Sequence, residues 1–220
     1  MTSSKISKKT IAIIIPAKNE YLNLLKLLPK INEHNFHVII INDGSKDNTK
    51  QLKNNFNNLK IVNLKKSIGY DNALKYGLLK AKKKFKFAIT MDSDFEHDPK
   101  YFNKFINYFE KNFDLVIGER NRKNRLVEII FSFYFKKYFY LNDIFCGYRG
   151  IRLNKLKTKH LKNKKINLPE IIFFIHKKYR NTKNFNIKCK ERIGGSKFGN
   201  SFVGNLKLLI QILGVIFKKI

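Results

Sequence analysis

The chain has 220 residues, enough for one domain with a substantial core, and 43% of them are hydrophobic, which excludes a disordered protein. Its 46 Lys and Arg against 16 Asp and Glu give a formal net charge of +30, a field that attracts nucleic acid, anionic lipid or phosphorylated ligands. Lys, Asn, Ile and Phe are abundant together, so a bias toward AT-rich codons explains the charge equally well. Charge alone therefore does not indicate nucleic-acid binding.

The first half of the chain alternates between apolar runs and helical patterns. The expected strands are residues 11–15, 36–41, 59–64, 85–91 and 115–118, and the expected helices are residues 22–31, 46–56, 69–82 and 98–111. Strands that alternate with helices form right-handed βαβ units. The sequence thus predicts an α/β, Rossmann-like fold with a mostly parallel sheet and flanking helices.

The second half is less regular. Residues 126–141 are strongly aromatic, residues 171–179 predict a helix, and residues 185–190 predict a strand. Apolar residues from Phe202 to Ile220 recur at helical spacing opposite a narrow polar stripe, which predicts an amphipathic C-terminal helix. We therefore divide the chain into a domain of residues 1–199 and a helix of residues 200–220.

Compartment signals point to the cytoplasm. Cys146 and Cys189 lack metal-type spacing and favour a reducing environment. The N-terminal MTSSKISKKT is polar and basic, so no secretory signal is expected. No run approaches the roughly 18–20 apolar residues of a spanning helix, so we expect contact with a membrane to be peripheral.

Polar residues follow the predicted strands at the edge where parallel sheets bind ligands. They are Asn19 and Glu20 after the first strand, Asp43 after the second, Asp92 and Asp94 after the fourth, and Glu119 and Arg120 after the fifth. Asp92 and Asp94 suit a hard divalent cation shared with phosphate oxygens, although acidic turns are also common in solvated loops. Asp43 suits ribose hydroxyls, but an ordinary Asp-Gly turn explains it as well.

Cations form a second group of candidates. The three arginines Arg120, Arg149 and Arg192 follow the dipeptides Gly118-Glu119, Gly147-Tyr148 and Lys190-Glu191, respectively. The planar guanidinium group of arginine binds phosphate bidentately. Ser196 and Lys197 close a glycine-rich turn that suits an anion. In so cationic a chain, a solvated surface position is an equally good interpretation of any single arginine.

Taken together, the motifs IPAKNE, INDGSKDNT, SIGYDNALKYG, MDSDFEHDP, IGER, DIFCGYRG and ERIGGSKF resemble family 2 glycosyltransferases in content and order. Within that family they are most similar to the dolichyl- or polyprenyl-phosphate sugar synthases. The resemblance runs from about Ile11 to Lys197 and implies a GT-A fold.

The resemblance also implies roles for residues. The nucleotide pocket would be lined by Pro16, Ala17, Glu20 and Asp43, and the Mg²⁺ or Mn²⁺ ligands would be Asp92, Asp94 and Glu96. The cations facing phosphate would be Arg120, Arg149, Arg192 and Lys197, with Ser196 beside them. We interpret Asp94, Arg120 and Arg149 as catalytic.

The chain departs from the family pattern in places. Asn42 replaces the first Asp of the usual Asp-Asp-Gly-Ser, Lys18 takes a position that is often Tyr, and the segment between Arg120 and Asp143 is short and aromatic. These departures leave the base and the sugar of the donor open.

The acceptor decides the detailed function. A hydroxyl acceptor needs a carboxylate base, for which Glu119 and Asp143 are candidates. A lipid phosphate needs only cations, because its second pKa is about 6. The chain lacks the Glu-Asp and Gln-x-x-Arg-Trp pattern of hydroxyl-transferring relatives and has no Trp. We therefore expect an inverting transfer of a hexose from a nucleotide sugar to a polyprenyl phosphate at the cytoplasmic face of a membrane.

Two other functions stay open: transfer to a saccharide hydroxyl in cell-surface glycan synthesis, and polyanion binding on a catalytically dead fold. A nucleotidyltransferase would need a glycine-rich, basic loop that IPAKNE does not provide.

We expect no nucleic-acid partner, and a homo-oligomer or a membrane-protein partner is compatible with the sequence. The aromatic segment and the C-terminal helix suit a headgroup region, or alternatively pack on the sheet or on a partner subunit.

Overall fold

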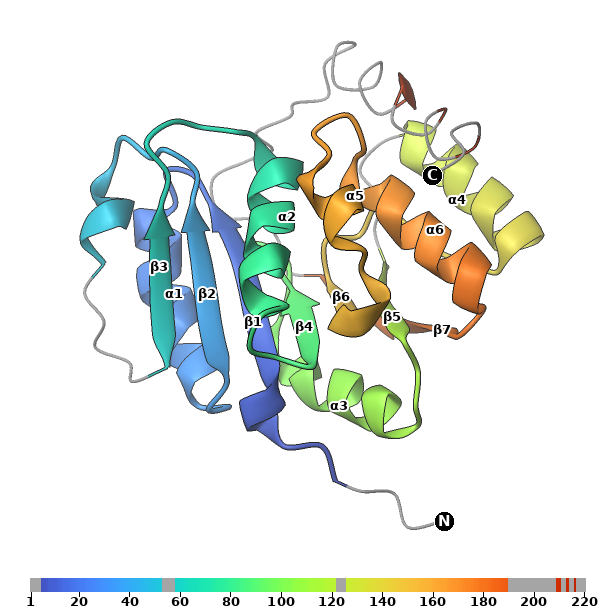
Figure 1. The fold of residues 1–220 in the computed structure, drawn as a ribbon, viewed down its shortest axis with the longest axis horizontal. Coiled ribbons are helices and arrows are strands. Elements are labelled where there is room, and N and C mark those ends of the chain that lie inside the picture. Colours follow the sequence, from blue (N-terminus) through green and yellow to red (C-terminus); the bar gives the residue numbers. More distant parts are fainter. Residues whose placement is uncertain are drawn as a thin grey trace.

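A computed structural model of the chain describes residues 5–52, 58–121 and 126–189, together with residues 209, 210, 213 and 216. Over these residues the strands form one seven-stranded sheet of order β3-β2-β1-β4-β6-β5-β7 (Figure 1). The strands are β1 (Ile11–Ala17), β2 (His37–Asn42), β3 (Leu59–Asn63), β4 (Phe87–Thr90), β5 (Leu115–Arg120), β6 (Arg149–Arg152) and β7 (Thr182–Ile187). The helices are α1 (Tyr21–Asn32), α2 (Tyr70–Ala81), α3 (Phe102–Glu110), α4 (Leu126–Phe139), α5 (Thr158–Lys162) and α6 (Leu168–Tyr179).

The sheet is mostly parallel, as the alternation of strands and helices predicts. β1 lies between β2 and β4 and runs parallel to both, and β5 runs parallel to β7. β6 is the exception, since it is antiparallel to β4 and to β5. The sequence analysis did not predict β6, because its four residues, RGIR, carry no strand periodicity. The predicted helix of residues 46–56 was too long within the described part, where only a short 3₁₀ turn, Asn48–Gln51, forms.

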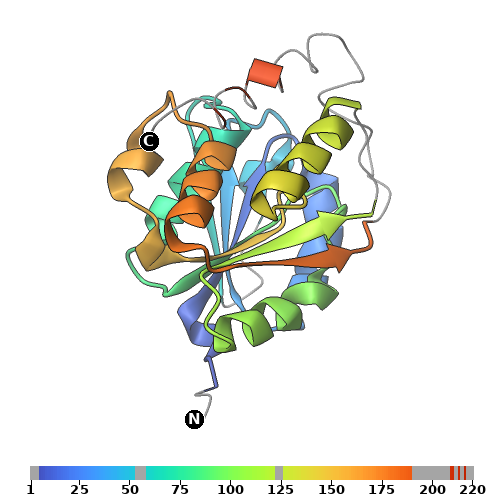
Figure 2. The same ribbon diagram turned by 90° about the vertical axis from the view of Figure 1, so that its right-hand side faces the viewer.

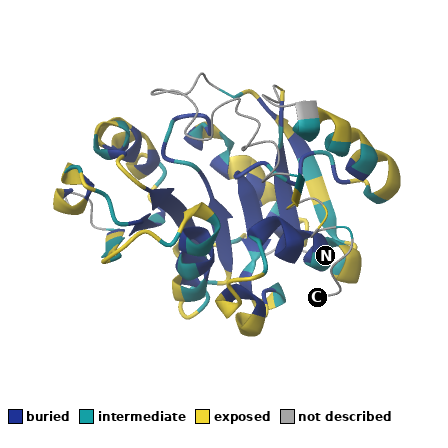
Figure 3. Ribbon diagram, turned by 90° about the horizontal axis from the view of Figure 1, so that it is seen from above, coloured by how far each residue is buried: buried dark blue, intermediate teal, exposed yellow. Residues whose placement is uncertain are grey.

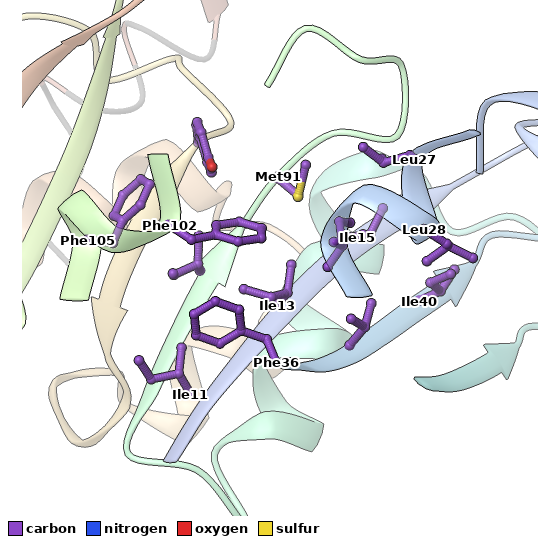
Figure 4. Close-up of a cluster of buried hydrophobic side chains, with 14 of the residues drawn as sticks. Ile11, Ile13, Ile15, Leu27, Leu28, Phe36, Ile40, Met91, Phe102 and Phe105 are labelled. Carbon is purple, nitrogen blue, oxygen red and sulfur yellow. The ribbon is translucent and has the colours of Figure 1, made fainter. Parts of the chain in front are cut away.

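Burial on both faces explains the unbroken apolar run of β1. Ile11, Ile13 and Ile15 point into one cluster with α1 and α3, whereas Ala12 and Ile14 point into the other with α2. Figure 4 shows the first cluster, where the β1 isoleucines meet aromatic rings of neighbouring elements. Figure 2 shows α3 on one side of the β5–β7 edge and α4 and α6 on the other. Buried residues fill the strands and the inner sides of the helices (Figure 3).

α4 accounts for the aromatic segment of residues 126–141. Its inward face packs on α6 through aromatic contacts, with ring centroids of Phe135 and Phe173 5.5 Å apart and those of Phe139 and Phe173 4.8 Å apart. Its outward face is apolar as well, since Ile130 is 55% and Phe133 69% exposed. Among the described residues, no helix is both long enough and apolar enough to span a membrane.

The predicted C-terminal helix is described only in part. Leu209, Ile210, Leu213 and Ile216 are helical, and the rest of residues 200–220 lies outside the described residues. The division at residue 199 and the amphipathic character of the last segment therefore stay predictions.

α2 approaches the sheet closely at Gly77. A Cβ atom at this position would lie 2.4 Å from Ile14 Cγ2 and 3.1 Å from Ile41 Cγ1. We expect Gly77→Ala to lower the free energy of unfolding by about 1–2 kcal/mol, because overpacking costs about 1–3 kcal/mol and better helix propensity offsets at most about 1 kcal/mol. Urea unfolding followed by circular dichroism would measure this. Lys80→Ala, on the exposed side of α2, is the control, and an equal effect of both changes would contradict the close approach.

Candidate active site

The loops that follow β1 and β2 are joined by side-chain hydrogen bonds. The Asn19 amide donates to Ser45 Oγ at 2.9 Å, and the Tyr21 amide donates to Asp47 Oδ2 at 2.9 Å. Glu20 lies buried at the start of α1, where its amide donates to Thr49 Oγ1 at 3.3 Å. These bonds make one continuous surface from the two strand ends.

Pro16 and Ala17, the expected nucleotide-pocket residues of β1, are buried in the sheet, and their carbonyls tie neighbouring loops to it. Ser93 Oγ donates to the Pro16 carbonyl at 3.3 Å, and the Asp43 amide donates to the Ala17 carbonyl at 2.8 Å. They therefore lie at the expected edge of the sheet, between Asp43 and the acidic turn after β4.

Asp43 holds the loop that precedes α2. Its carboxylate accepts hydrogen bonds from the Ile68 amide at 2.6 Å, from Ser67 Oγ at 2.7 Å and from the Gly69 amide at 3.1 Å. Lys18 Nζ donates to the same Ser67 hydroxyl at 3.1 Å. Asp43 thus shapes this side of the site through bonds within the protein, and its direct contact with a nucleotide stays a prediction.

The departure at Asn42 has a local explanation. Its Oδ1 accepts from the Ser45 amide at 3.1 Å, a bond that an aspartate would also accept. Its Nδ2 donates to Asn63 Oδ1 at 2.8 Å, and a carboxylate has no proton for that bond. The amide therefore suits the pairing of β2 with β3 in this chain.

The acidic turn after β4 holds a group of metal-type side chains. Within the described residues, donor atoms of Asp92, Glu96 and His97 lie within 4.8 Å of one another. Carboxylate oxygens are the donors that Mg²⁺ and Mn²⁺ prefer, so the donor set fits such an ion. Asp94, an expected ligand, is not in this group; its Oδ1 instead accepts from the Glu96 amide at 3.1 Å and closes the turn.

His97 was missed by the sequence analysis, although it adjoins Glu96. Its Nδ1 accepts from the Asp92 amide at 3.0 Å, and its Nε2 lies 3.8 Å from Cys146 Sγ. The ring is buried and stacks on Tyr148 with centroids 4.9 Å apart. His97 Nδ1 already accepts a hydrogen bond within the protein. Through this atom, His97 therefore fixes the backbone at Asp92 and does not serve as a metal ligand.

Two further residues contact Asp92 from outside its own loop. The Tyr70 hydroxyl, at the start of α2, donates to Asp92 Oδ1. A Cβ atom at Gly147 would lie 2.7 Å from Tyr70 Oη and 3.0 Å from both Asp92 oxygens, so a side chain there would have to displace these groups. Burial of the hydroxyl, followed by the charge of Asp92, holds the pKa of Tyr70 well above its usual value. The hydroxyl therefore stays protonated and remains a donor.

Arg120 has a different role from the expected one. Its Nε donates to Asp143 Oδ2 at 2.8 Å, and its Nη2 donates to Asp143 Oδ1 at 3.0 Å and to Glu128 Oε2 at 3.3 Å. The guanidinium is buried and already neutralised by these carboxylates. We therefore do not retain Arg120 as a phosphate clamp, and Asp143 is correspondingly committed and unsuited to act as a base.

Arg149 fits its expected role better. It is 2% exposed, its Nη2 donates to the Ile144 carbonyl at 2.9 Å, and its Nε has no hydrogen-bond partner among the described residues. Burial raises the pKa of Asp71, and the charge of Arg149 opposes that rise, so the two groups share one environment. A buried guanidinium with an unused donor suits an anion. Arg192, Ser196 and Lys197 lie outside the described residues.

The seven-stranded sheet and its flanking helices form a GT-A-like α/β fold. Among solved structures, glucosyl-3-phosphoglycerate synthase of Mycobacterium tuberculosis, in complex with Mn²⁺ and UDP-glucose, aligns with a TM-score of 0.72 at 13% identity over 94% of this chain and 79% of that one. The sequence pattern described as glycosyl transferase family 2 matches residues 12–198. The chain belongs to this family. The expected Mg²⁺ or Mn²⁺ cofactor agrees with the Mn²⁺ of the solved structure and with the metal-type group of Asp92, Glu96 and His97.

Curated relatives share part of the chain. An uncharacterized protein of Methanocaldococcus jannaschii is 31% identical over 165 residues, which are 66% of this chain and 72% of that protein. The dolichyl-phosphate beta-glucosyltransferase of Dictyostelium discoideum is 30% identical over 132 residues, or 50% of this chain and 40% of the relative. The undecaprenyl-phosphate 4-deoxy-4-formamido-L-arabinose transferase of Proteus mirabilis is 28% identical over 135 residues, or 56% and 40%. The matched region thus spans 40% of the length of each of these two transferases.

The contacts of Arg120 lead to a stability prediction. We expect Arg120→Ala to lower the free energy of unfolding by about 3–5 kcal/mol, because it removes the charged partner of the buried Asp143 carboxylate and leaves it the backbone amide of residue 120. Asp143→Ala should cost a similar amount, and the double variant much less than the sum. Urea unfolding followed by circular dichroism measures all three. Additive effects, or an unchanged stability of Arg120→Ala, would contradict the pair.

Proposed function

We propose that this protein is a metal-dependent, inverting glycosyltransferase that moves a hexose from a nucleotide sugar to a polyprenyl phosphate. The observation that carries the proposal is the position of the buried Arg149, with its unused Nε donor, on β6 next to the acidic turn of β4. Arg149, which can bind an anion, and the acidic turn, which can bind a cation, thus lie on or directly after neighbouring strands. The names of the two lipid-phosphate relatives support this acceptor class. The solved glucosyl-3-phosphoglycerate synthase holds a phosphorylated molecule, phosphoglyceric acid, together with UDP-glucose.

On the donor side, Asp92 and Glu96 would hold the divalent cation, and Asp94 shapes their turn through its bond to the Glu96 amide. When bound, such a cation neutralises the charge that develops on the departing nucleoside diphosphate. The nucleoside would bind at the loops that follow β1 and β2. Asp43 and Glu20 fix the loops of this region through hydrogen bonds within the protein.

On the acceptor side, Arg149 would hold the lipid phosphate, assisted by Arg192, Ser196 and Lys197. A phosphate oxygen attacks the anomeric carbon, the bond from that carbon to the donor diphosphate breaks, and the diphosphate leaves with the electron pair. One displacement inverts the anomeric configuration. No general base is required, because the phosphate is already ionised near neutral pH with a second pKa of about 6. Catalysis is then mainly positioning and electrostatic stabilisation.

A saccharide hydroxyl is the second candidate acceptor, and one observation favours it. Glu119 lines a cavity of about 300 Å³ together with Ser132, Phe133 and Lys136. Asn142 Nδ2 donates to Glu119 Oε2 at 2.6 Å. Glu119 therefore replaces Asp143 as the better candidate for a general base in this reaction.

The outward face of α4 supports peripheral contact with a membrane. Ile129, Ile130 and Phe133 are exposed, and Lys136 and Lys137 are exposed on the next turn. An apolar surface beside basic side chains suits an interface with anionic headgroups. A polyprenyl phosphate would be presented in that layer.

The activity is tested by incubating the purified chain with membrane lipid extract, radiolabelled nucleotide sugars and Mn²⁺, followed by organic extraction. We expect metal-dependent label in the organic phase and its loss in Asp92→Ala.

Arg149→Ala should raise the KM for the lipid phosphate by at least about tenfold, since a hydrogen bond to a charged group contributes about 1.5–3 kcal/mol. Label in a saccharide product, abolished by Glu119→Gln, would replace the lipid acceptor with a hydroxyl. Polyanion binding that falls steeply with salt and survives Asp92→Ala, without any transfer, would instead indicate a binding protein.

The membrane contact has its own prediction. We expect the double variant Ile130→Ser and Phe133→Ser to bind vesicles of phosphatidylcholine and phosphatidylglycerol at least about tenfold more weakly, because burying each apolar side chain contributes about 1.5–3 kcal/mol. Leu22→Ser and Leu25→Ser on α1 form the matched control, since these leucines are 70% and 47% exposed. Co-sedimentation measures the binding, and equal binding of both double variants would count against α4.

A further inference from the structure

We propose that Tyr70 is a positioning residue that orients Asp92 for the divalent cation. The inference rests on the metal site of the proposed function and adds a residue that acts on it through Asp92. Tyr70 stands at the first position of α2, and Asp92 follows β4. The two residues belong to separate elements and meet only in the folded sheet.

Asp92 is bonded both at its carboxylate and at its backbone amide. The Tyr70 hydroxyl donates to Oδ1, and the backbone amide of Asp92 donates to His97 Nδ1 at 3.0 Å. The backbone at Gly147 lies so close that a Cβ atom there would stand 3.0 Å from both carboxylate oxygens. The Tyr70 bond therefore fixes one carboxylate oxygen, and the absence of a side chain at Gly147 leaves room for the bonded pair.

This arrangement makes the two carboxylate oxygens different. Oδ1 accepts the Tyr70 proton, and no hydrogen bond to Oδ2 is found among the described residues, although His97 Nδ1 lies 3.6 Å from it. His97 Nδ1 already accepts the Asp92 amide proton, so it does not donate to Oδ2. Tyr70 thus leaves Oδ2 as the oxygen available to a cation and favours binding through one oxygen.

Tyr70 also joins the two halves of the site. Asp43 holds Ser67, Ile68 and Gly69 by three hydrogen bonds, and Tyr70 is the next residue along the chain. The loop that follows β2 is therefore linked through residues 67–70 to the carboxylate that follows β4. A displacement of residues 67–70 would therefore move the Tyr70 hydroxyl and change the position of the Asp92 carboxylate.

Tyr70→Phe tests the proposal, because it removes one hydroxyl and keeps the ring. Mn²⁺ binding to the full chain, without donor or acceptor, is measured from the electron paramagnetic resonance signal of free Mn²⁺. We expect the dissociation constant to rise by about 10-fold or more, as for other groups that orient metal ligands. Tyr76→Phe on the same helix is the matched control, because no hydrogen bond of its hydroxyl is found among the described residues, and it should bind as the wild type does.

Gly147→Ala provides a second test, since its added methyl group would displace Tyr70 or Asp92 and should weaken Mn²⁺ binding comparably. Circular dichroism confirms that each variant is folded. Tyr70→Phe with wild-type affinity, while Asp92→Ala abolishes binding, would overturn the positioning role and leave the metal site intact. Absence of Mn²⁺ binding by the wild type would overturn both.

Discussion

The burial of β1 on both faces is the constraint on which the rest of the structure depends. Its side chains alternate between two helical layers, so the strand has to be apolar throughout and must lie between β2 and β4. That position brings the carboxyl ends of three strands to one edge. The candidate site residues lie at that edge because the loops that follow the three strands all begin there.

Much of this arrangement follows from sequence pattern. The apolar runs of β1, β2 and β4 and the helical spacing of α2 were sufficient to predict the parallel core and to place Asp43 and Asp92 at one edge. β6 was beyond reach, because a four-residue antiparallel strand has no periodicity of its own and forms only where β4 and β5 leave room for it. Its residue Arg149 was nevertheless a candidate phosphate-binding residue in the sequence, because it follows Gly147-Tyr148 and matches a family motif.

Individual contacts were the least predictable part. An arginine near the end of a strand looks the same in sequence whether it faces a ligand or a carboxylate of its own chain. Arg120 is paired with Asp143, 23 residues away, whereas Arg149 keeps an unused donor, and only the folded positions distinguish them. His97 was missed for a similar reason, since its link to Asp92 is a bond from a backbone amide that side-chain spacing does not report.

The contacts that position Asp92 join parts of the chain that are far apart in the sequence. Tyr70 lies 22 residues before Asp92, and Gly147 reaches the same place through its carbonyl, which accepts from Thr90 across 57 residues. Forming these contacts carries the entropy cost of closing the intervening loops. The proposed cation site therefore exists only where α2, the loop after β4 and the segment before β6 have come together.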